Sequence, residues 1–518
     1  MEETFINKFK KSLSNTEDKI FIYEASTNLS YSYLNFYTDT LRICYILNTK
    51  YQKCEVVILA GKNSYQYAVY IMATILSGKK LFPLNPEENK STFKKLVDQI
   101  SHPHIIFSDQ FFLSEELVHI PLTLHRDEKI PEDFFPTGPQ ENQDLVYIPT
   151  SATTGESKIV VQKEKAIISN INALIFHHKL MPDSNIATPL PLFHVNALHF
   201  SFFCTFFCGG TITLFEQFDL RKTFQLIEQN KIKILSVIPS ILANIARNHD
   251  QISEYNIESL LYFVSAAAPL SVNTVKKINE TLGKKIIQGY GLSESVNFTC
   301  TVPIDISKEL YRSTMIDDKF PTIGITLLEN QIIILDKMGT PCGQNIEGEI
   351  TIKSPSLMSS YLNTPSDLFF RNGYLRTGDL GFFKSINQQN FYFISGRIKE
   401  TAKINGKTIS LRELDEQIQL IKNIDIDCIS TSFVNDYRGE EIALVCKISS
   451  KDESFSTFES LSESLKKLNQ DCRPRIIIFS TLLPIRTPSG KAKRWAFKPY
   501  LEKYKDHRFL NSIIFINL

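Results

Sequence analysis

The sequence predicts an α/β protein with a large N-terminal domain of layered, mostly parallel sheets and helices, followed by a small β-rich subdomain and a small α+β domain. Three observations support this fold class. Between residues 54 and 283 strand-like apolar runs alternate with longer helix-like runs, a pattern typical of parallel sheets. From about 324 to 395 short β segments separated by turns take over. The last ~120 residues contain strands and helices of their own.

Strands and helices follow one another closely in the N-terminal part. The run "CEVVILA" (54–60) is apolar enough for a buried strand, and "NSYQYAVYIMATILSGK" (63–79) is long enough for a helix that returns beside it. We expect the strands to lie parallel, with the helices over the faces of the sheets. Further strand–helix pairs occur at 79–84 with 88–100, at 233–239 with 240–250, and at 259–270 with 271–283.

The C-terminal part begins after a polar turn. The β segments "NQIIILDKMGTPCGQNIEGEITIKS" (330–354) and "FYFISG" (391–396) end near Gly396–Glu400. Beyond this turn a helix-like run and three apolar runs follow, which predict a separate small domain. We therefore place the domain boundary there, which gives domains 1–396 and 397–518.

Length and composition describe a globular protein with no electrostatic preference for polyanions. A chain of 518 residues is too long for one ordinary core, and 43% hydrophobic with 22% charged residues is a typical globular composition. The net charge of +1 gives no case for nucleic acid or an anionic membrane as partner. The apolar stretch 197–215 contains His199 and is broken by two glycines, so we expect a buried helix and a strand there instead of a membrane span.

The compartment is predicted from the N-terminus and the cysteines. The opening "MEETFINKFKKSL" lacks the apolar core of a secretory signal. Nine cysteines are scattered without a paired framework or a metal-ligand spacing, which favours free buried thiols. We expect a cytoplasmic protein.

The stretch "VYIPTSATTGESKIVV" (146–161) is a candidate phosphate loop. Four hydroxyl side chains lie within the five positions 150–154, Gly155 permits a close approach to the backbone, and Lys158 supplies a positive charge, all between two strand-like runs. It is not a Walker loop, which needs a Gly-Lys-Ser/Thr ending between a strand and a helix. On its own residues the stretch is either a phosphate loop or a polar hairpin turn.

At least six motifs, in order, resemble those of the adenylate-forming superfamily, which includes acyl- and aryl-CoA synthetases, stand-alone adenylation domains and luciferases. The resemblance extends from "LSYSYLNFYTDTL" (29–41) to "PSGKAKRW" (488–495). Besides the loop at 150–159, the motifs are "PLPLFHVNAL" (189–198), "SAAAPLS" (265–271), "QGYGLSES" (288–295), "NGYLRTGDLGFF" (372–383), "SGRIKETAKINGKTISLRELDE" (395–416) and "LLPIRTPSGKAKRW" (482–495).

The resemblance implies that ATP and Mg²⁺ bind. Glu294 would bind the metal, Asp379 the ribose hydroxyls, and Arg397 the ribose and the α-phosphate side. The loop departs from the family pattern at Ala152, Ser157 and Ile159, which replace Gly, Pro and Gly. The remaining nucleotide contacts would come from Thr150, Ser151, Thr153, Thr154, Gly155, Lys158, Ala267, Gly289, Tyr290, Gly291 and Ser293.

The resemblance also assigns a pocket for the acid. His194, Val195, Asn196 and Ala266 would line it. Val195 stands where amino-acid-activating relatives carry an Asp for the substrate ammonium, so a plain carboxylic acid is the expected substrate. No Arg lies in 190–200 or 262–270 to pair a second carboxylate of a dicarboxylic acid.

In such a family member the small domain is mobile and the preceding β-rich part is β-barrel-like. Lys399 would be the hinge, Gly406 would line the tunnel for the pantetheine thiol, and Lys491 would act on the oxygens between acid and phosphate. The predicted catalytic residues are therefore Lys491, Lys158, Glu294 and Arg397.

The predicted function is ATP-dependent activation of a carboxylic acid to an acyl-adenylate with release of pyrophosphate, followed by thioester formation with CoA. An enzyme that loads the phosphopantetheine of an acyl or peptidyl carrier protein would use the same residues and stays an alternative. The loop departures leave a degenerate nucleotide-binding protein as a third hypothesis. Nothing in the sequence indicates luciferase-type oxidation, and the acid itself stays open.

Overall fold

The computed structural model describes residues 4–14, 16–109, 119–150, 158–365, 369–421, 426–450, 454–481, 485–487, 491–509 and 513–517. The chain divides into two compact units. The first comprises 1–317, 323–331 and 352–375, and the second comprises 318–322, 332–351 and 376–518.

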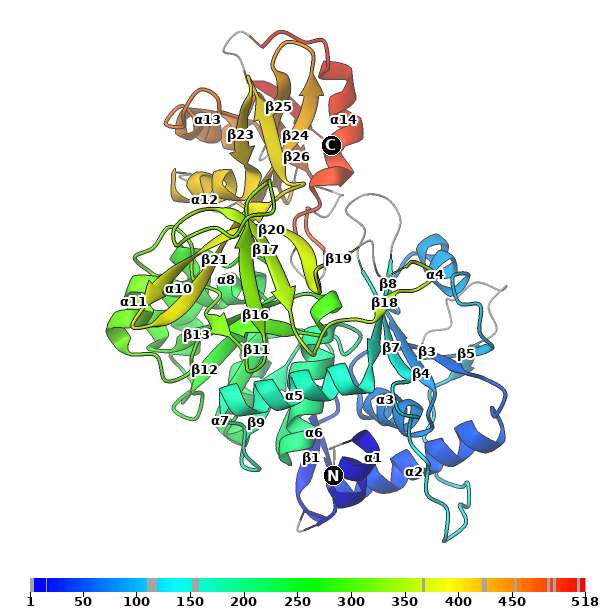
Figure 1. Ribbon diagram of the computed structural model, residues 1–518. Coiled ribbons are helices and arrows are strands. Elements are labelled where there is room, and N and C mark those ends of the chain that lie inside the picture. Colours follow the sequence, from blue (N-terminus) through cyan, green and yellow to red (C-terminus); the bar gives the residue numbers. More distant parts are fainter. Residues whose placement is uncertain are drawn as a thin grey trace. The chain divides into compact units, whose positions relative to one another are not determined.

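The first unit contains a nine-stranded sheet with a parallel centre (Figure 1). The strands lie in the order β15-β14-β13-β12-β11-β9-β10-β1-β2. Those from β13 to β1 pair in parallel, whereas β2, β14 and β15 are antiparallel to their neighbours. Their bounds are β1 (Ile20–Glu24), β2 (Leu29–Ser32), β9 (Asn185–Thr188), β10 (Thr211–Leu214), β11 (Ile234–Val237), β12 (Tyr262–Ser265), β13 (Lys285–Gly291), β14 (Phe298–Thr301) and β15 (Ile325–Thr326).

A seven-stranded sheet in the same unit has the order β18-β8-β7-β4-β3-β5-β6. The pairs between β7 and β6 are parallel, and β8 is antiparallel to both β7 and β18. The apolar residues of β3 are fully buried because this strand lies near the centre of the sheet. The bounds are β3 (Val56–Ala60), β4 (Lys80–Leu84), β5 (His104–Ser108), β6 (His119–Pro121), β7 (Asp144–Pro149), β8 (Ile159–Lys163) and β18 (Ser360–Tyr361).

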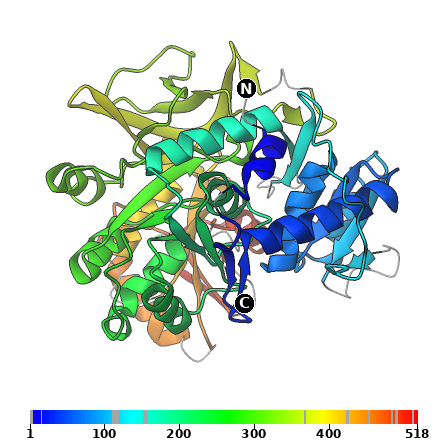
Figure 2. The same ribbon diagram turned by 90° about the horizontal axis from the view of Figure 1, so that it is seen from below.

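Helices pack apolar side chains against these sheets. Helix α4 (Lys90–Val97) packs Phe93, Leu96 and Val97 onto the seven-stranded sheet (Figure 1). Helices α2 (Tyr33–Thr49) and α3 (Tyr65–Leu76) lie side by side (blue in Figure 2). The other helices are α1 (Phe5–Lys11), α5 (Glu164–His178), the π-helix η1 (Asn196–Phe203), α6 (Cys204–Cys208), α7 (Leu220–Asn230), α8 (Pro239–Arg247), α9 (His249–Ile252), α10 (Val272–Leu282), the 3₁₀ turn η2 (Ser293–Ser295) and α11 (Lys308–Met315).

The second unit holds long antiparallel strands and a mixed sheet. The part of strand β20 (Tyr374–Ile386) from Asp379 to Ile386 pairs with β21 (Gln389–Arg397), in a sheet that also contains β16 (Gln331–Leu335) and β17 (Gly348–Lys353). The short strand β19 (Phe370–Arg371), which pairs with Tyr374 and Leu375, belongs to the first unit. A six-stranded sheet has the order β23-β22-β25-β26-β27, with β24 paired to β25. Its bounds are β22 (Thr401–Ile404), β23 (Lys407–Ser410), β24 (Cys428–Asn435), β25 (Gly439–Lys447), β26 (Ile476–Ser480) and β27 (Ile514–Asn517).

Both faces of the six-stranded sheet are covered. Alternate residues of β25 belong to two separate apolar clusters, because successive side chains of a strand point to opposite faces. Helices α12 (Leu411–Ile421) and α13 (Ser454–Leu465) contribute to one cluster. The 3₁₀ turn η5 (Arg494–Phe497) and helix α14 (Lys498–Leu501), which the short 3₁₀ turn η6 (Glu502–Tyr504) follows, contribute to the other.

The predicted α/β class with largely parallel sheets is confirmed. The stretch 197–215 forms a buried helix and strand β10 as expected, although its first part is a π-helix, which the sequence did not indicate. All nine cysteines are free thiols. No helix in the described ranges is long and apolar enough to cross a membrane. A turn separates β21 from β22 where the polar turn was expected, and the domains 1–396 and 397–518 stay a prediction.

Candidate active site

The two ends of the candidate phosphate loop are held together by the hairpin of β7 and β8. The backbone N–H and hydroxyl of Thr150 both donate to the carbonyl of Lys158, at 2.8 and 3.1 Å. Ile159 is the first residue of β8 and is buried. The predicted contacts Ser151, Thr153, Thr154 and Gly155, with the departures Ala152 and Ser157, lie outside the described residues.

Lys158 directs its ammonium toward two aromatic rings. Nζ lies 4.7 Å from the ring centroid of Tyr361 and 4.5 Å from that of Phe369. The two rings meet edge to face with centroids 4.5 Å apart. Each ring face attracts a cation. The side chain of Lys158, which would contact phosphate, is exposed to solvent. The two rings nevertheless hold its ammonium at a defined place.

Glu294 lies in a strained turn at the end of β13. A side chain at Gly291 would overlap the backbone of Asn297, with a Cβ only 1.7 Å from its carbonyl oxygen, so the close approach of β14 requires glycine. Val296, directly after η2, has a φ of +63°, which is unfavourable for a β-branched residue. Such strain is found where the surrounding structure fixes a functional side chain.

The carboxylate of Glu294 is bound to Tyr361. The Tyr361 hydroxyl donates to Oε1 of Glu294 at 2.6 Å. Burial, and then the negative charge of Glu294, raise the pKa of Tyr361, which keeps this phenol a donor. Sequence reasoning did not single out Tyr361, because a tyrosine in "SSYLN" has no chemical signature of its own.

The predicted acid-pocket segment forms the start of η1. Val195 caps the π-helix, and Asn196 is buried without a hydrogen-bond partner among the described residues for either amide atom. His194 is partly buried, with its ring next to Phe193. π-helical turns occur frequently at functional sites because they change the direction of side chains.

A buried chain of hydrogen bonds connects η1 with the turn of Glu294. Nε2 of Gln162 donates to the carbonyl of Ser293 at 2.9 Å, and Oε1 of Gln162 lies 2.9 Å from Nε2 of His199. Because the Gln162 amide faces a carbonyl with its nitrogen, its oxygen accepts from His199, whose proton is therefore on Nε2. Burial lowers the pKa of His199 to about 3, so the imidazole is neutral.

The predicted adenine-bordering residues lie at the carboxyl ends of two neighbouring parallel strands of the nine-stranded sheet. Strand β12 ends at Ser265, Ala266 is buried, and Ala267 is exposed with a φ of +72°. On β13, Tyr290 is largely buried and a side chain at Gly289 would overlap the ring of Phe298. These residues share the sheet edge where α/β proteins bind nucleotides.

In the second unit, Asp379 and Arg397 are opposite one another on β20 and β21. Nε of Arg397 donates to Oδ1 of Asp379 at 2.6 Å, and the Asp379 side chain is almost fully buried. Gly378, with a φ of +71°, precedes Asp379 and donates its N–H to buried Glu349 at 3.1 Å. The predicted ribose and phosphate contacts thus form a charged pair.

The predicted hinge and thiol-tunnel residues lie in tight turns of the same unit. Lys399 is exposed in the turn between β21 and β22. Asn405 and Gly406, with φ values of +51° and +78°, join β22 to β23 in a two-residue hairpin. Asn-Gly favours such a hairpin because both residues tolerate positive φ.

The backbone of Lys491 is held by Thr487. Its carbonyl accepts from the N–H of Thr487 at 2.8 Å, and its N–H donates to the Thr487 hydroxyl at 3.0 Å. Three residues later, buried Arg494 donates to Glu400 at 3.1 Å and to Asp415 at 2.7 Å. Arg494 lies in the motif at 482–495, but the sequence did not indicate that it anchors this segment.

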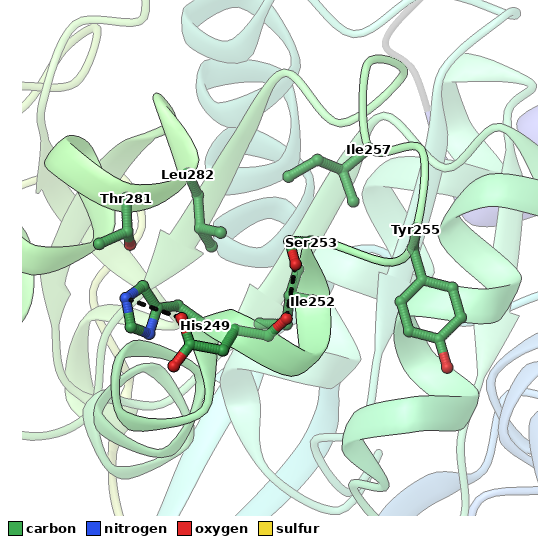
Figure 3. Close-up of a pocket in the computed structure, with 8 residues that line it drawn as sticks. His249, Ile252, Ser253, Tyr255, Ile257, Thr281 and Leu282 are labelled. Atoms are coloured by element: carbon green, nitrogen blue, oxygen red, sulfur yellow. Dashed lines mark hydrogen bonds and ion pairs between the residues drawn. The ribbon is translucent and has the colours of Figure 1, made fainter.

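The described surface also has a hollow of about 420 Å³ beside α9 and the end of α10 (Figure 3). The residues around it are His249, Asp250, Ile252, Ser253, Tyr255, Ile257, Thr281 and Leu282. Among the residues that the structure describes, none of those predicted for catalysis or binding lines this hollow. We assign it no part in the chemistry.

Comparison with known proteins assigns this chain to a family. The family model described as "AMP-binding enzyme" matches residues 9–362. 4-Coumarate–CoA ligase 3 of Arabidopsis thaliana is 26% identical over 517 residues, which cover 94% of this chain and 90% of that protein.

Solved structures share the fold at low sequence identity. The o-succinylbenzoate CoA synthetase (MenE) of Bacillus subtilis, in complex with its acyl-adenylate intermediate, matches with a TM-score of 0.81, 20% identity, and 96% and 98% coverage of this chain and that one. McyG A-PCP, complexed with phenylalanyl-adenylate, matches with a TM-score of 0.85, 20% identity, and 97% and 83% coverage.

The family match and the CoA ligase relatives confirm the predicted function at the level of the family, which is adenylation of a carboxylic acid followed by thioester formation. The roles assigned to single residues stay predictions. Because the family model covers more than half of the sequence, the chain belongs to the family of AMP-binding enzymes.

Proposed function

We propose that this AMP-binding enzyme is an acid–CoA ligase that uses Mg-ATP to activate an uncharged-tail carboxylic acid. One observation carries the proposal: Lys158 and Glu294 both contact Tyr361, one at the ring and the other at the hydroxyl, without forming an ion pair with each other. A cation and a carboxylate that are close but not paired suit a polyphosphate with its metal. The acid attacks the α-phosphate, and pyrophosphate leaves toward Lys158.

Glu294 fits the requirements of a Mg²⁺ ligand. Mg²⁺ is usually held by one or two carboxylates together with substrate phosphates, and Glu294 supplies one carboxylate. When bound, the ion neutralises charge that builds up on the phosphate oxygens. Lys491 would stabilise the oxygens between acid and phosphate, and Asp379 with Arg397 would hold the ribose and the α-phosphate side.

The character of the acid is proposed from η1. Val195 offers no charge, His199 is neutral because burial lowers its pKa to about 3, and the buried amide of Asn196 has no partner among the described residues. A charged tail would be desolvated there without compensation, whereas an uncharged hydrogen-bonding substituent would satisfy the amide. A hydroxylated aromatic acid such as 4-coumarate, named for the CoA ligase relatives, has this character.

CoA is proposed as the acceptor on the strength of these relatives. The Asn405–Gly406 hairpin would border the thiol path, since Gly406 has no atom within 4 Å of an added Cβ. A carrier-protein phosphopantetheine presents the same thiol arm, so it is the other outcome of the test below.

The test is acid-dependent release of pyrophosphate by the full chain, with and without CoA, across aromatic and aliphatic acids. We expect release with hydroxylated aromatic acids and conversion to a CoA thioester. Lys491→Ala should slow release on the order of 10²–10³-fold, whereas Lys493→Ala, two positions away in the same segment, should change it less than about two-fold.

Two results would contradict the proposal. Equal rates of pyrophosphate release for the wild type and Lys491→Ala would show that this site does not catalyse adenylation. Release without thioester from CoA, restored by a phosphopantetheinylated carrier protein, would replace CoA as the acceptor.

A further inference from the structure

Three distant parts of the chain meet at Tyr361. Strand β18 pairs with β8, with Tyr361 opposite Val160, so Tyr361 lies beside the strand that begins one residue after Lys158 (Figure 1). The N–H of Met358 donates to the carbonyl of Glu294 at 2.8 Å, which joins the same segment to η2. Backbone pairing therefore brings Tyr361 within reach of both charged side chains.

The ring and the hydroxyl of Tyr361 act on different charges. The ring, together with that of Phe369, holds the Lys158 ammonium at 4.7 and 4.5 Å. The hydroxyl donates to Oε1 of Glu294 at 2.6 Å. Within the part of the chain that the structure describes, Oε2 of Glu294 makes no hydrogen bond or ion pair, so this oxygen is open to another ligand.

Lys158 and Glu294 would be expected to attract each other. Opposite charges a few ångströms apart attract each other, and the attraction is stronger where less water lies around them. Here they form none, because the ammonium rests on the two rings and the carboxylate is bound by the hydroxyl. A direct pair would have to break before phosphate and metal could bind.

We infer that Tyr361 is a positioning residue that keeps Lys158 and Glu294 apart and so leaves the first for phosphate and the second for the metal. Phe369 supports only the lysine side of this arrangement. The inference rests on the proposed Mg-ATP function, and it assigns the two functions of Tyr361 to separate atoms.

Because the ring of Tyr361 contacts Lys158 and its hydroxyl contacts Glu294, three variants of the full chain can test the two contacts separately. Tyr361→Phe keeps the ring and removes the hydroxyl, Tyr361→Leu removes both, and Phe369→Leu removes only the second ring. Tyr70→Phe is the matched control, because the Tyr70 hydroxyl donates to the carbonyl of Thr123 at 2.9 Å. Binding is measured by calorimetry with α,β-methylene-ATP, at fixed Mg²⁺ and in a Mg²⁺ titration.

Each variant has its own expected signature. Tyr361→Phe should raise the Mg²⁺ concentration for half-saturation about ten-fold, because a hydrogen bond to a charged group is lost, and change nucleotide affinity at saturating Mg²⁺ little. Phe369→Leu should weaken nucleotide binding about three-fold and leave the Mg²⁺ dependence unchanged. Tyr361→Leu should weaken both, by more than either single effect.

A second readout reports the lysine directly. After reductive ¹³C-methylation of the lysines, the NMR signals of Lys158, assigned with Lys158→Arg, should show an upfield ring-current shift. Tyr361→Phe should keep that shift, and Tyr361→Leu should reduce it, because only the ring of Phe369 then remains.

The outcomes separate this inference from the proposed function. If the wild type does not bind the nucleotide with Mg²⁺, the proposed function fails and the inference with it. If the wild type binds and Tyr361→Phe matches Tyr70→Phe in its Mg²⁺ dependence, only the positioning role of Tyr361 is wrong. An unshifted Lys158 signal in the wild type would likewise overturn it.

Discussion

Asp379 and Arg397 face each other across paired positions of β20 and β21, with Nε of Arg397 2.6 Å from Oδ1 of Asp379. The long antiparallel pairing fixes this register, so the two side chains approach without any loop having to close. One group would bind the ribose and the other the phosphate side of the nucleotide. Their pairing means that a change at one residue also alters the other.

Asp379→Asn should weaken ATP binding about ten-fold or more, because an amide cannot accept from both ribose hydroxyls as a carboxylate does. Binding of inorganic triphosphate, which has no ribose, should be nearly unchanged. Calorimetric titration of both ligands measures the difference. Asp427→Asn, which removes an Asp–Arg pair with Arg486 at 2.9 Å, is the control. Equal losses for the two ligands would contradict ribose binding by Asp379.

Gly406→Ala should slow thioester formation about ten-fold and leave adenylation unchanged. An added Cβ at φ +78° meets no atom within 4 Å, so the effect comes from backbone strain and from the methyl group in the thiol path. Gly283→Ala is matched, since Gly283 also has a positive φ, +63°, and open space. Single-turnover transfer from the preformed adenylate to CoA is the measurement. Equal effects of both alanines would mean that strain alone is responsible.

Arg494→Met should lower the free energy of unfolding of the second unit by about 3–5 kcal/mol, because it leaves two partly buried carboxylates, Glu400 and Asp415, without this partner. Lys466→Met removes an exposed pair with Glu463 and should cost less than about 1 kcal/mol. Urea denaturation followed by far-UV circular dichroism compares the two. Similar midpoints for both variants would show that Arg494 is not an anchor.

The free energy of unfolding should fall as pH rises from about 4.5 to 7, because of the buried carboxyl of Glu416. Burial raises the pKa of this carboxyl from 4.5 to about 7, so the unfolded chain loses the proton in this window while the folded chain keeps it. Glu416→Gln cannot ionise and should remove this part of the pH dependence. Thermal unfolding at pH 5 and pH 8 measures it, with Glu459→Gln, at an exposed position of helix α13, as the control. A wild type and Glu416→Gln with the same pH dependence would contradict the raised pKa.

The sequence predicted elements well where periodicity and turn chemistry are local. The strand–helix alternation, the β-rich segment, and the Asn405–Gly406 hairpin each depend on residues close together in the chain. The π-helical start of η1 was missed because a continuous apolar run contains no signal that distinguishes one helix type from another.

The sequence predicted only those residues of the candidate site that lie in recognisable motifs. Lys158, Glu294, Asp379 and Arg397 were found because each stands in a motif with a recognisable pattern. Tyr361 was not, because its role arises from the pairing of β18 with β8, a contact between residues about 200 positions apart. The roles of Lys399 and Lys491 stay predictions.

The two-residue strand β18 also limits how the chain can change in length. Side chains alternate between the faces of a strand, so inserting or deleting a single residue between Met358 and Tyr361 would turn the phenol to the opposite face of the sheet. Substitutions at the other positions of this segment are then tolerable, but insertions and deletions are not. Among homologues, length should be invariant here even where composition drifts.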